Sequence, residues 1–146
     1  MNKTGKSVYE EETKSDNKNV EVNSFLSIFD EIQTVYAEKK VLICSGKIIT
    51  YQELNIHSNK LANFLIKAGA KKEGLVGVCM ERTPNLLITI LGILKAGAAF
   101  LPLDPSFPVD RLNYMVEHSD SRLIITDSKS NGAFNFHNVK NILKMY

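Results

Sequence analysis

Cysteine, net charge and long apolar runs are all scarce in this sequence. Its two cysteines, Cys44 and Cys79, lie far apart, each within a short apolar run. The chain therefore lacks the closely spaced cysteine pairs of a typical zinc site, and we predict that both residues are buried free thiols. The formal net charge of +2 is too small to indicate a nucleic-acid partner or an anionic membrane surface.

The hydrophobic pattern excludes the usual signals of membrane insertion or secretion. The longest apolar run, Leu86–Leu94, is much shorter than the roughly 20 residues that cross a bilayer. The start of the chain is polar and lacks the apolar core of a secretory signal. With 44% hydrophobic and 23% charged residues, the composition is that of an ordinary globular domain. We therefore expect a soluble, cytoplasmic protein with neither a nucleic-acid nor a membrane partner.

Motifs that carry chemistry are also missing. The sequence contains neither G-x-x-x-x-G-K-[ST] nor G-x-G-x-x-G, the two common phosphate-binding patterns. His57, His118 and His137 share no motif with a nucleophile or a metal-ligand set, so we interpret them as ordinary side chains. Asp104 and Thr126–Ser128 follow predicted strands, where α/β proteins often place functional groups, but loop geometry and helix capping explain them equally well. We therefore predict no catalytic, cofactor-binding or metal-ligating residue in this chain.

Hydrophobic periodicity predicts an α/β fold preceded by a polar segment. Residues 1–23 have mixed charge and no periodicity, and we interpret them as a tail or linker. From Ser24, a good N-cap residue, strands and helices alternate. This alternation indicates βαβ units and a mainly parallel sheet flanked by helices, with a small N-terminal hairpin. The predicted strands are 41–44, 47–49, 75–80, 98–101, 122–126 and, less clearly marked, 139–143; the predicted helices begin at Ser24, Thr50, Thr83 and Pro108.

Local signals mark the ends of the predicted helices. Thr50–Glu53 fits a capping box, in which the Thr hydroxyl and the Glu carboxylate satisfy free backbone N–H groups. Gly69 is expected to end that helix in the left-handed conformation. Thr83 is expected to cap the next helix, with Pro84 in its first turn. Because residues 86–94 are apolar nearly all round, this helix should be buried on most sides.

Two stretches resemble core motifs of one enzyme family. Ile49–Leu54 (ITYQEL) is similar to the first core motif, L-T-Y-x-E-L, of the amino-acid adenylation domains of nonribosomal peptide synthetases. Leu94–Pro105 (LKAGAAFLPLDP) resembles the second, L-K-A-G-x-A-Y-L-P-L-D-P, and departs from it only at Phe100. The resemblance covers about residues 24–127. Four shorter matches fit the same family: Asn59–Ala62, Cys79–Pro84, Phe107–Pro108 and Arg111–Leu112.

The resemblance implies an incomplete N-terminal subdomain of an adenylate-forming enzyme, with residues 24–146 truncated before the phosphate-binding loop. A complete domain of this family binds ATP with Mg²⁺, forms an aminoacyl adenylate and loads a carrier protein. The remainder of the synthetase and a carrier protein are therefore the implied partners. The family's triphosphate loop, substrate-gripping aspartate and catalytic lysine match nothing in this chain. We therefore carry over no site residue, and we expect the chain alone to be inactive.

Three alternatives remain open at this level. The fragment could come from a related ligase that activates fatty or aryl acids for coenzyme A, although Leu101–Pro108 is more similar to the amino-acid-activating branch. It could be an interaction module or a split-enzyme piece that docks on a partner, since a shortened parallel sheet has an unpaired edge. It could also be a free-standing nucleotide-binding protein of flavodoxin-like topology, against which the missing phosphate loop argues.

Overall fold

The computed structural model describes residues 24–44, 46–132 and 141–145. The predicted tail, 1–23, and His137 lie outside these residues, as does Ser45 of the predicted turn. The described elements, in chain order, are α1 (Phe25–Val35), β1 (Lys40–Cys44), β2 (Lys47–Thr50), α2 (Tyr51–Lys67), β3 (Leu75–Cys79), α3 (Pro84–Lys95), β4 (Ala99–Pro102), α4 (Val109–Ser119), β5 (Leu123–Asp127), a 3₁₀ turn (Ser130–Gly132) and β6 (Asn141–Met145).

The N-terminal half follows the local signals closely. The Ser24 hydroxyl accepts the Ser27 N–H at 3.2 Å and begins α1. Strands β1 and β2 pair antiparallel as the predicted hairpin. Both halves of the capping box are present: the Thr50 hydroxyl accepts the Glu53 N–H at 3.2 Å, and the Glu53 carboxylate accepts the Thr50 N–H at 2.9 Å. Gly69 follows the end of α2 with φ 96°, as expected of a left-handed helix stop.

The predicted parallel sheet is confirmed, with strand order β4-β3-β5-β6. All three of its strand pairs are parallel. Strand β3 is buried from Val76 to Cys79, which explains its unbroken apolar sequence. The predicted last strand, 139–143, is observed as Asn141–Met145, and positions 139 and 140 lie outside the described residues.

Two predictions at strand and helix ends were wrong in detail. The Thr83 side chain makes no capping hydrogen bond, because the Leu86 N–H that it would bind donates to the Thr83 carbonyl at 3.0 Å. The strand after α3 runs through Pro102 instead of stopping before it. Proline is tolerated there because β4 is an edge strand, where a missing N–H costs no ladder hydrogen bond.

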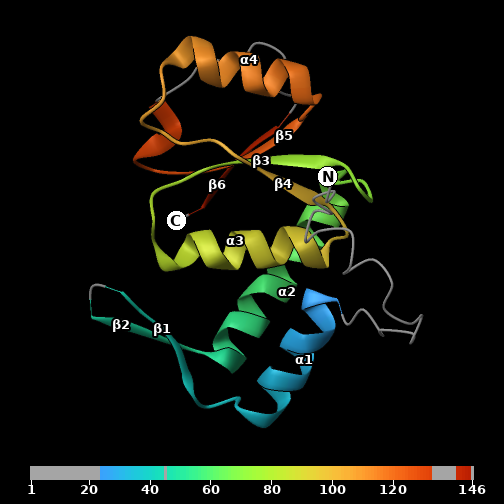
Figure 1. Cartoon of the computed structure of the whole chain (residues 1–146), viewed down its shortest axis with the longest axis vertical. Helices are drawn as coiled ribbons and strands as arrows, with labels where there is room; N and C mark the ends of the chain where they lie inside the picture. The colour runs from blue at the N-terminus through green and yellow to red at the C-terminus, as the bar shows by residue number, and fades with distance from the viewer. Residues whose placement is uncertain (1–23, 45, 133–140, 146) are drawn as a thin grey trace, which may run out of the picture.

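The elements form layers on the two faces of the sheet (Figure 1). Helix α4 covers one face over a small core of Cys79, Leu103, Leu112, Val116 and Ile124. Helix α3 lies against the other face, and α2 and α1 lie beyond it. Their larger core also includes residues from β3 and β5. Helices on both sides of the sheet are the predicted architecture.

Lys95, at the end of α3, links helices α1, α2 and α3. The Lys95 ammonium donates to the side-chain oxygens of Asn55 and Asn59 on α2, the latter at 2.7 Å. It also lies 5.1 Å from the centre of the Phe29 ring on α1. Burial lowers the pKa of Lys95, while the Asp30 carboxylate opposes that shift. Two amide oxygens and an aromatic face therefore hold one half-buried cation.

Candidate functional site

The carboxyl edge of the parallel sheet brings together three loops that are distant in the sequence. Met80–Arg82 follow β3, Leu103–Pro105 follow β4, and Ser128–Lys129 follow β5. In open α/β sheets this edge is where ligands bind. It is therefore the part of the described chain in which a functional site is expected.

Asp127, at the end of β5, joins two of these loops. One carboxylate oxygen accepts the Glu81 N–H at 2.8 Å. The other accepts the N–H groups of Lys129 and Ser130 at 3.1 Å and 2.8 Å. Burial alone would raise the pKa of Asp127, but these hydrogen bonds outweigh it and hold the pKa below its usual range. The carboxylate caps the turn after β5 and fixes the end of β3.

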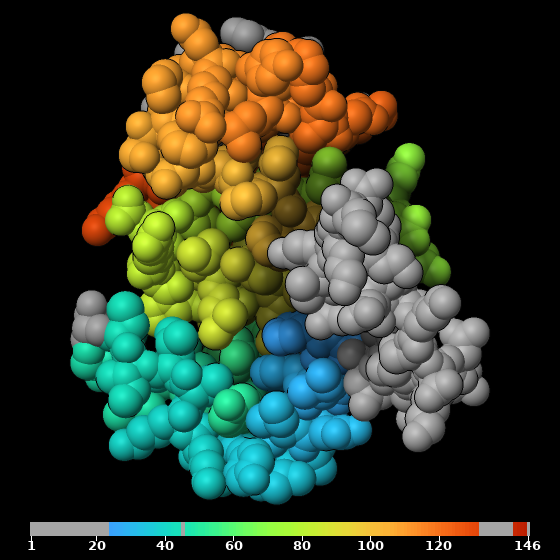
Figure 2. Space-filling model, viewed as in Figure 1, coloured from blue at the N-terminus to red at the C-terminus, as the bar shows by residue number. Residues whose placement is uncertain are grey.

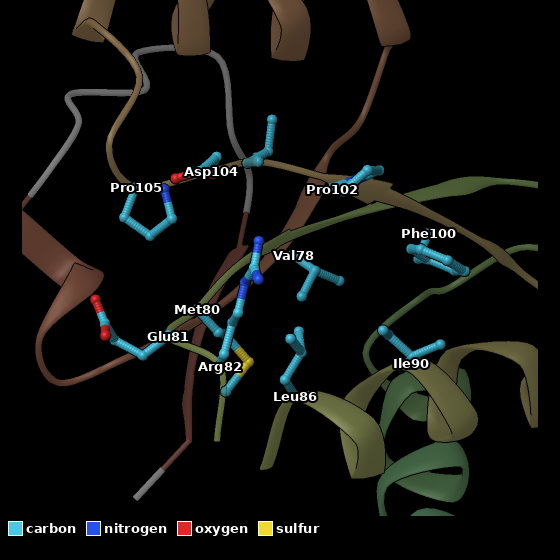
Figure 3. Close-up of a pocket in the computed structure, with 11 residues that line it drawn as sticks. Val78, Met80, Glu81, Arg82, Leu86, Ile90, Phe100, Pro102, Asp104 and Pro105 are labelled. Carbon is cyan, nitrogen blue, oxygen red and sulfur yellow. The ribbon is translucent and has the colours of Figure 1, made fainter. Parts of the chain in front are cut away.

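A groove of about 450 Å³ opens beside β4, and we call it the β4 groove (Figure 3). Its apolar walls come from three elements: Val78 and Met80 on or after β3, Leu86 and Ile90 on α3, and Phe100, Pro102, Leu103 and Pro105 on or after β4. The Arg82 side chain extends across its mouth, toward Val78 and Asp104.

Asp104 is held in a turn at the rim of the β4 groove. Its carboxylate accepts the Ser106 N–H at 2.9 Å. The hydrogen bonds from Ser106, backbone and hydroxyl, lower the pKa of Asp104, and the Arg82 charge adds to the effect. These contacts agree with the interpretation from sequence that Asp104 shapes the loop after β4.

A wider groove of about 790 Å³ lies between α2, the hairpin and the loop after β5. Basic side chains of Lys47, Lys60 and Lys129 line it, together with His57. Its acidic members are Glu81 and Asp127, and Asp127 already accepts three backbone N–H groups. His57, which we interpreted as an ordinary side chain, therefore lies at the edge of this wider groove and is exposed to solvent.

The remaining predicted residues occupy ordinary positions. Cys79 is fully buried, and burial, helped by the charges of Asp127 and Asp104, raises its pKa to about 12. It is the inert thiol that we predicted. The prediction that Cys44 is buried was wrong: it is only half-buried, because it lies at the end of the hairpin strand β1. His118 is exposed and stacks on Tyr114, with ring centres 3.8 Å apart.

The described residues do not fit a triphosphate. Each of the three loops at the carboxyl edge lacks glycine, whereas phosphate-binding loops use glycines to bring backbone N–H groups close to the ligand. The edge carboxylates Asp104 and Asp127 already accept backbone N–H groups. Within residues 24–44, 46–132 and 141–145, the structure contains no cluster of three or more His, Cys, Asp or Glu suited to a metal ion. We assign no step through a nucleotide or a metal to this edge.

Two features of the edge were missed from sequence. Arg82 stood inside a family-like stretch but carried no chemical signal of its own. The link from Asp127 to the Glu81 N–H joins positions 46 apart in the chain, and no local pattern reports it.

No helix in the described part of the chain has the length and apolar character needed to cross a bilayer.

Comparison with sequence families matches residues 29–144 to the family described as AMP-binding enzyme. Among curated proteins, bacitracin synthase 3 of Bacillus licheniformis is 39% identical over 102 residues, which are 70% of this chain and 2% of that protein. Gramicidin S synthase 2 of Brevibacillus brevis is 39% identical over 109 residues, or 75% of this chain and 2% of that protein. The chain therefore spans only a small fraction of the length of these relatives.

Solved structures show the same fold. The AMPPNP-bound form of the nonribosomal peptide synthetase FmoA3 superposes with a TM-score of 0.82 at 26% identity, over 91% of this chain and 14% of that one. The N-terminal subdomain of Klebsiella oxytoca NpsA, in complex with 3-hydroxybenzoyl-AMSN, superposes with a TM-score of 0.76 at 25% identity. That match covers 84% of this chain and 30% of the NpsA chain.

Proposed function

The chain belongs to the AMP-binding enzyme family, and from that premise we propose that it supplies scaffold, and not reacting groups, to an amino-acid adenylation domain of a nonribosomal peptide synthetase. The curated relatives are peptide synthetases, which favours the amino-acid-activating branch over the coenzyme A ligases. Among the solved structures, FmoA3 is a nonribosomal peptide synthetase, and NpsA also occurs in an artificially fused adenylation–PCP di-domain. Within that domain, residues 24–146 would form the N-terminal part and residues 1–23 a tail or linker.

One observation carries this proposal: several residues of both family-like motifs are engaged in capping and packing. Thr50 and Glu53 of the first motif cap α2. In the second, Lys95 binds two α2 side chains, and Leu103 is buried under α4. Residues that are already committed to internal contacts stabilise a fold and leave few groups free for substrate.

The second motif also sets the path of the chain from α3 into β4. Gly97 takes φ 76° after the helix, a conformation that glycine adopts without steric cost. Its carbonyl accepts the Glu73 N–H at 2.7 Å, and the Ala99 N–H donates to the Gly74 carbonyl at 2.9 Å. The motif thereby fixes β4 beside β3 and places Asp104 at the carboxyl edge.

The activity of the whole protein is part of the same proposal. The complete domain would use ATP and Mg²⁺ to convert an amino acid to its aminoacyl adenylate and load it onto a carrier protein. A cytoplasmic location and a role in secondary-metabolite biosynthesis follow from that assignment. Nucleotide, metal and amino acid would then contact other polypeptide of the same domain.

The proposal is tested by ATP–pyrophosphate exchange with the purified chain and each common amino acid, alongside calorimetric titration with ATP. A scaffold segment shows background exchange and no saturable heat of ATP binding. Exchange well above background would contradict the proposal. Saturable ATP binding without exchange would instead revive a free-standing nucleotide-binding protein.

A further inference from the structure

The wider groove, of about 790 Å³, combines a buried apolar floor with a basic rim. Leu61 and Ile88 line it and are only 8% and 6% exposed, so they form its floor. The rim consists of the exposed side chains of Lys47, Lys60 and Lys129, which come from the hairpin, α2 and the loop after β5. The hairpin, in cyan, and α3, in yellow-green, form two of the walls and lie next to each other in Figure 2.

The rim lysines have no acidic partner among the described residues. The one ion pair between described side chains joins Arg122 to Asp120. Glu81 and Asp127 are the acidic residues that line the groove. The Asp127 carboxylate already accepts three backbone N–H groups, which partly balance its charge. The rim therefore carries an excess of positive charge, and this favours an acidic ligand.

The rim is suited to a ligand that carries several charges together with apolar groups. A single exposed ion pair contributes little, because water and salt screen both charges. Phe64 also lines the groove and is 52% exposed, so its ring is available for apolar contact. An extended acidic segment with neighbouring aliphatic or aromatic side chains meets both requirements.

The chain itself contains one segment with this chemistry. Residues 8–12 (VYEEE), which we call the acidic segment, join a valine and a tyrosine to the only run of three acidic residues in the sequence. We propose that the acidic segment binds in the wider groove, with its carboxylates at the rim lysines and Tyr9 against Phe64. This contact goes beyond the proposed scaffold function and does not depend on it.

The acidic segment can reach the groove within one chain. Glu12 and Ser24 are 12 positions apart, a length of polypeptide that spans up to about 40 Å. Helix α1, which follows Ser24, meets the end of α3, where Lys95 lies 5.1 Å from the Phe29 ring centre. The groove is at the other end of α3, at Pro84, and a helix of 12 residues is about 18 Å long. The connection therefore gives the segment a high effective concentration at the groove.

Carbodiimide crosslinking of the full chain tests this contact, because the reagent joins carboxylates to lysine amines that touch them. The crosslinked positions are mapped by mass spectrometry. Lys40 and Lys67 are matched controls: they are exposed, they lie on the hairpin and on α2, and they do not line the groove. An equal mixture of ¹⁵N-labelled and unlabelled chains distinguishes crosslinks within a chain from crosslinks between chains.

Crosslinks from Glu10, Glu11 and Glu12 should form with the rim lysines in a yield roughly fivefold or more above that with the two control lysines. The yield should fall as salt is raised to about 1 M. No crosslinks to the rim, or equal yields at rim and control lysines, would overturn the proposal. Crosslinks mainly between labelled and unlabelled chains would also overturn it, because the segment would then bind a second copy.

A variant with Glu10→Gln, Glu11→Gln and Glu12→Gln gives an independent readout. These positions lie outside the described fold, and circular dichroism checks that the variant folds. Loss of the acidic segment's charge should raise acetylation of the rim lysines by an amine-reactive ester roughly threefold or more, while Lys40 and Lys67 stay unchanged. Unchanged acetylation of the rim lysines would contradict the proposal.

Discussion

Replacement of Asp127 by Asn tests the link between the loops after β3 and β5. The carboxylate accepts three backbone N–H groups, from Glu81, Lys129 and Ser130, at 2.8–3.1 Å. An asparagine has the same shape but a single acceptor atom. If its oxygen keeps the bonds to Lys129 and Ser130, its NH₂ group faces the Glu81 N–H, donor against donor.

The cost can be estimated from that lost bond. A hydrogen bond to a charged group contributes about 1.5–3 kcal/mol. Because Asp127 is partly exposed, water replaces some of that loss, and we expect Asp127→Asn to lower the free energy of unfolding by about 1–2 kcal/mol at pH 7. Urea unfolding followed by circular dichroism measures it. Asp120→Asn is the control, because the ion pair of Asp120 with Arg122 is highly exposed and such pairs contribute little.

The same variant makes a prediction about pH. The pKa of Asp127 is lower in the folded state than its ordinary value of 3.8, so the folded state favours the ionised form. That stabilisation is complete above the unfolded-state pKa and is lost as pH falls through the lower, folded-state value. The stability gap between wild type and Asp127→Asn should therefore be full at pH 7 and shrink below about pH 4. A gap that stays constant as pH falls well below that point, or one no larger than that of Asp120→Asn, would refute the reasoning.

Three further predictions concern the interior. Lys95→Met removes two hydrogen bonds to side-chain oxygens of α2 and should lower the free energy of unfolding by about 1–3 kcal/mol; a change within experimental error in urea unfolding would contradict this. Gly92→Val should lower the free energy of unfolding by about 1–3 kcal/mol in the same assay, because a Cβ at this position lies 2.9–3.0 Å from three Leu61 atoms. Unchanged stability would contradict this, since it would show that α2 and α3 can separate freely. Cys79, buried and with its pKa raised to about 12, should resist iodoacetamide at pH 8 in the folded chain while Cys44 is labelled, as mass spectrometry of the alkylated protein would report.

Sequence reasoning succeeded where the determining interactions are local. The capping box joins Thr50 to Glu53, three positions apart, and Gly69 ends its helix by its own backbone freedom. The parallel sheet was predictable because apolar strands without alternation need cover on both faces. In each case neighbouring residues contain the whole physical reason.

The features that sequence reasoning missed depend on residues far apart in the chain. Lys95 meets α2 residues 36 and 40 positions earlier, and the Asp127–Glu81 bond spans 46 positions. Whether Thr83 caps through its side chain depends on where the Leu86 N–H points, which composition does not determine. The groove between the hairpin and α3 likewise exists only because these two elements meet in space.

A graft tests the central claim most directly. Residues 24–145 replace the equivalent segment in the matching adenylation domain of bacitracin synthase 3, and ATP–pyrophosphate exchange is measured with each common amino acid. If this segment is scaffold, the graft exchanges pyrophosphate with the amino-acid preference of its host. A folded graft that changes that preference would show that residues of this segment contact the substrate, and the claim would be wrong.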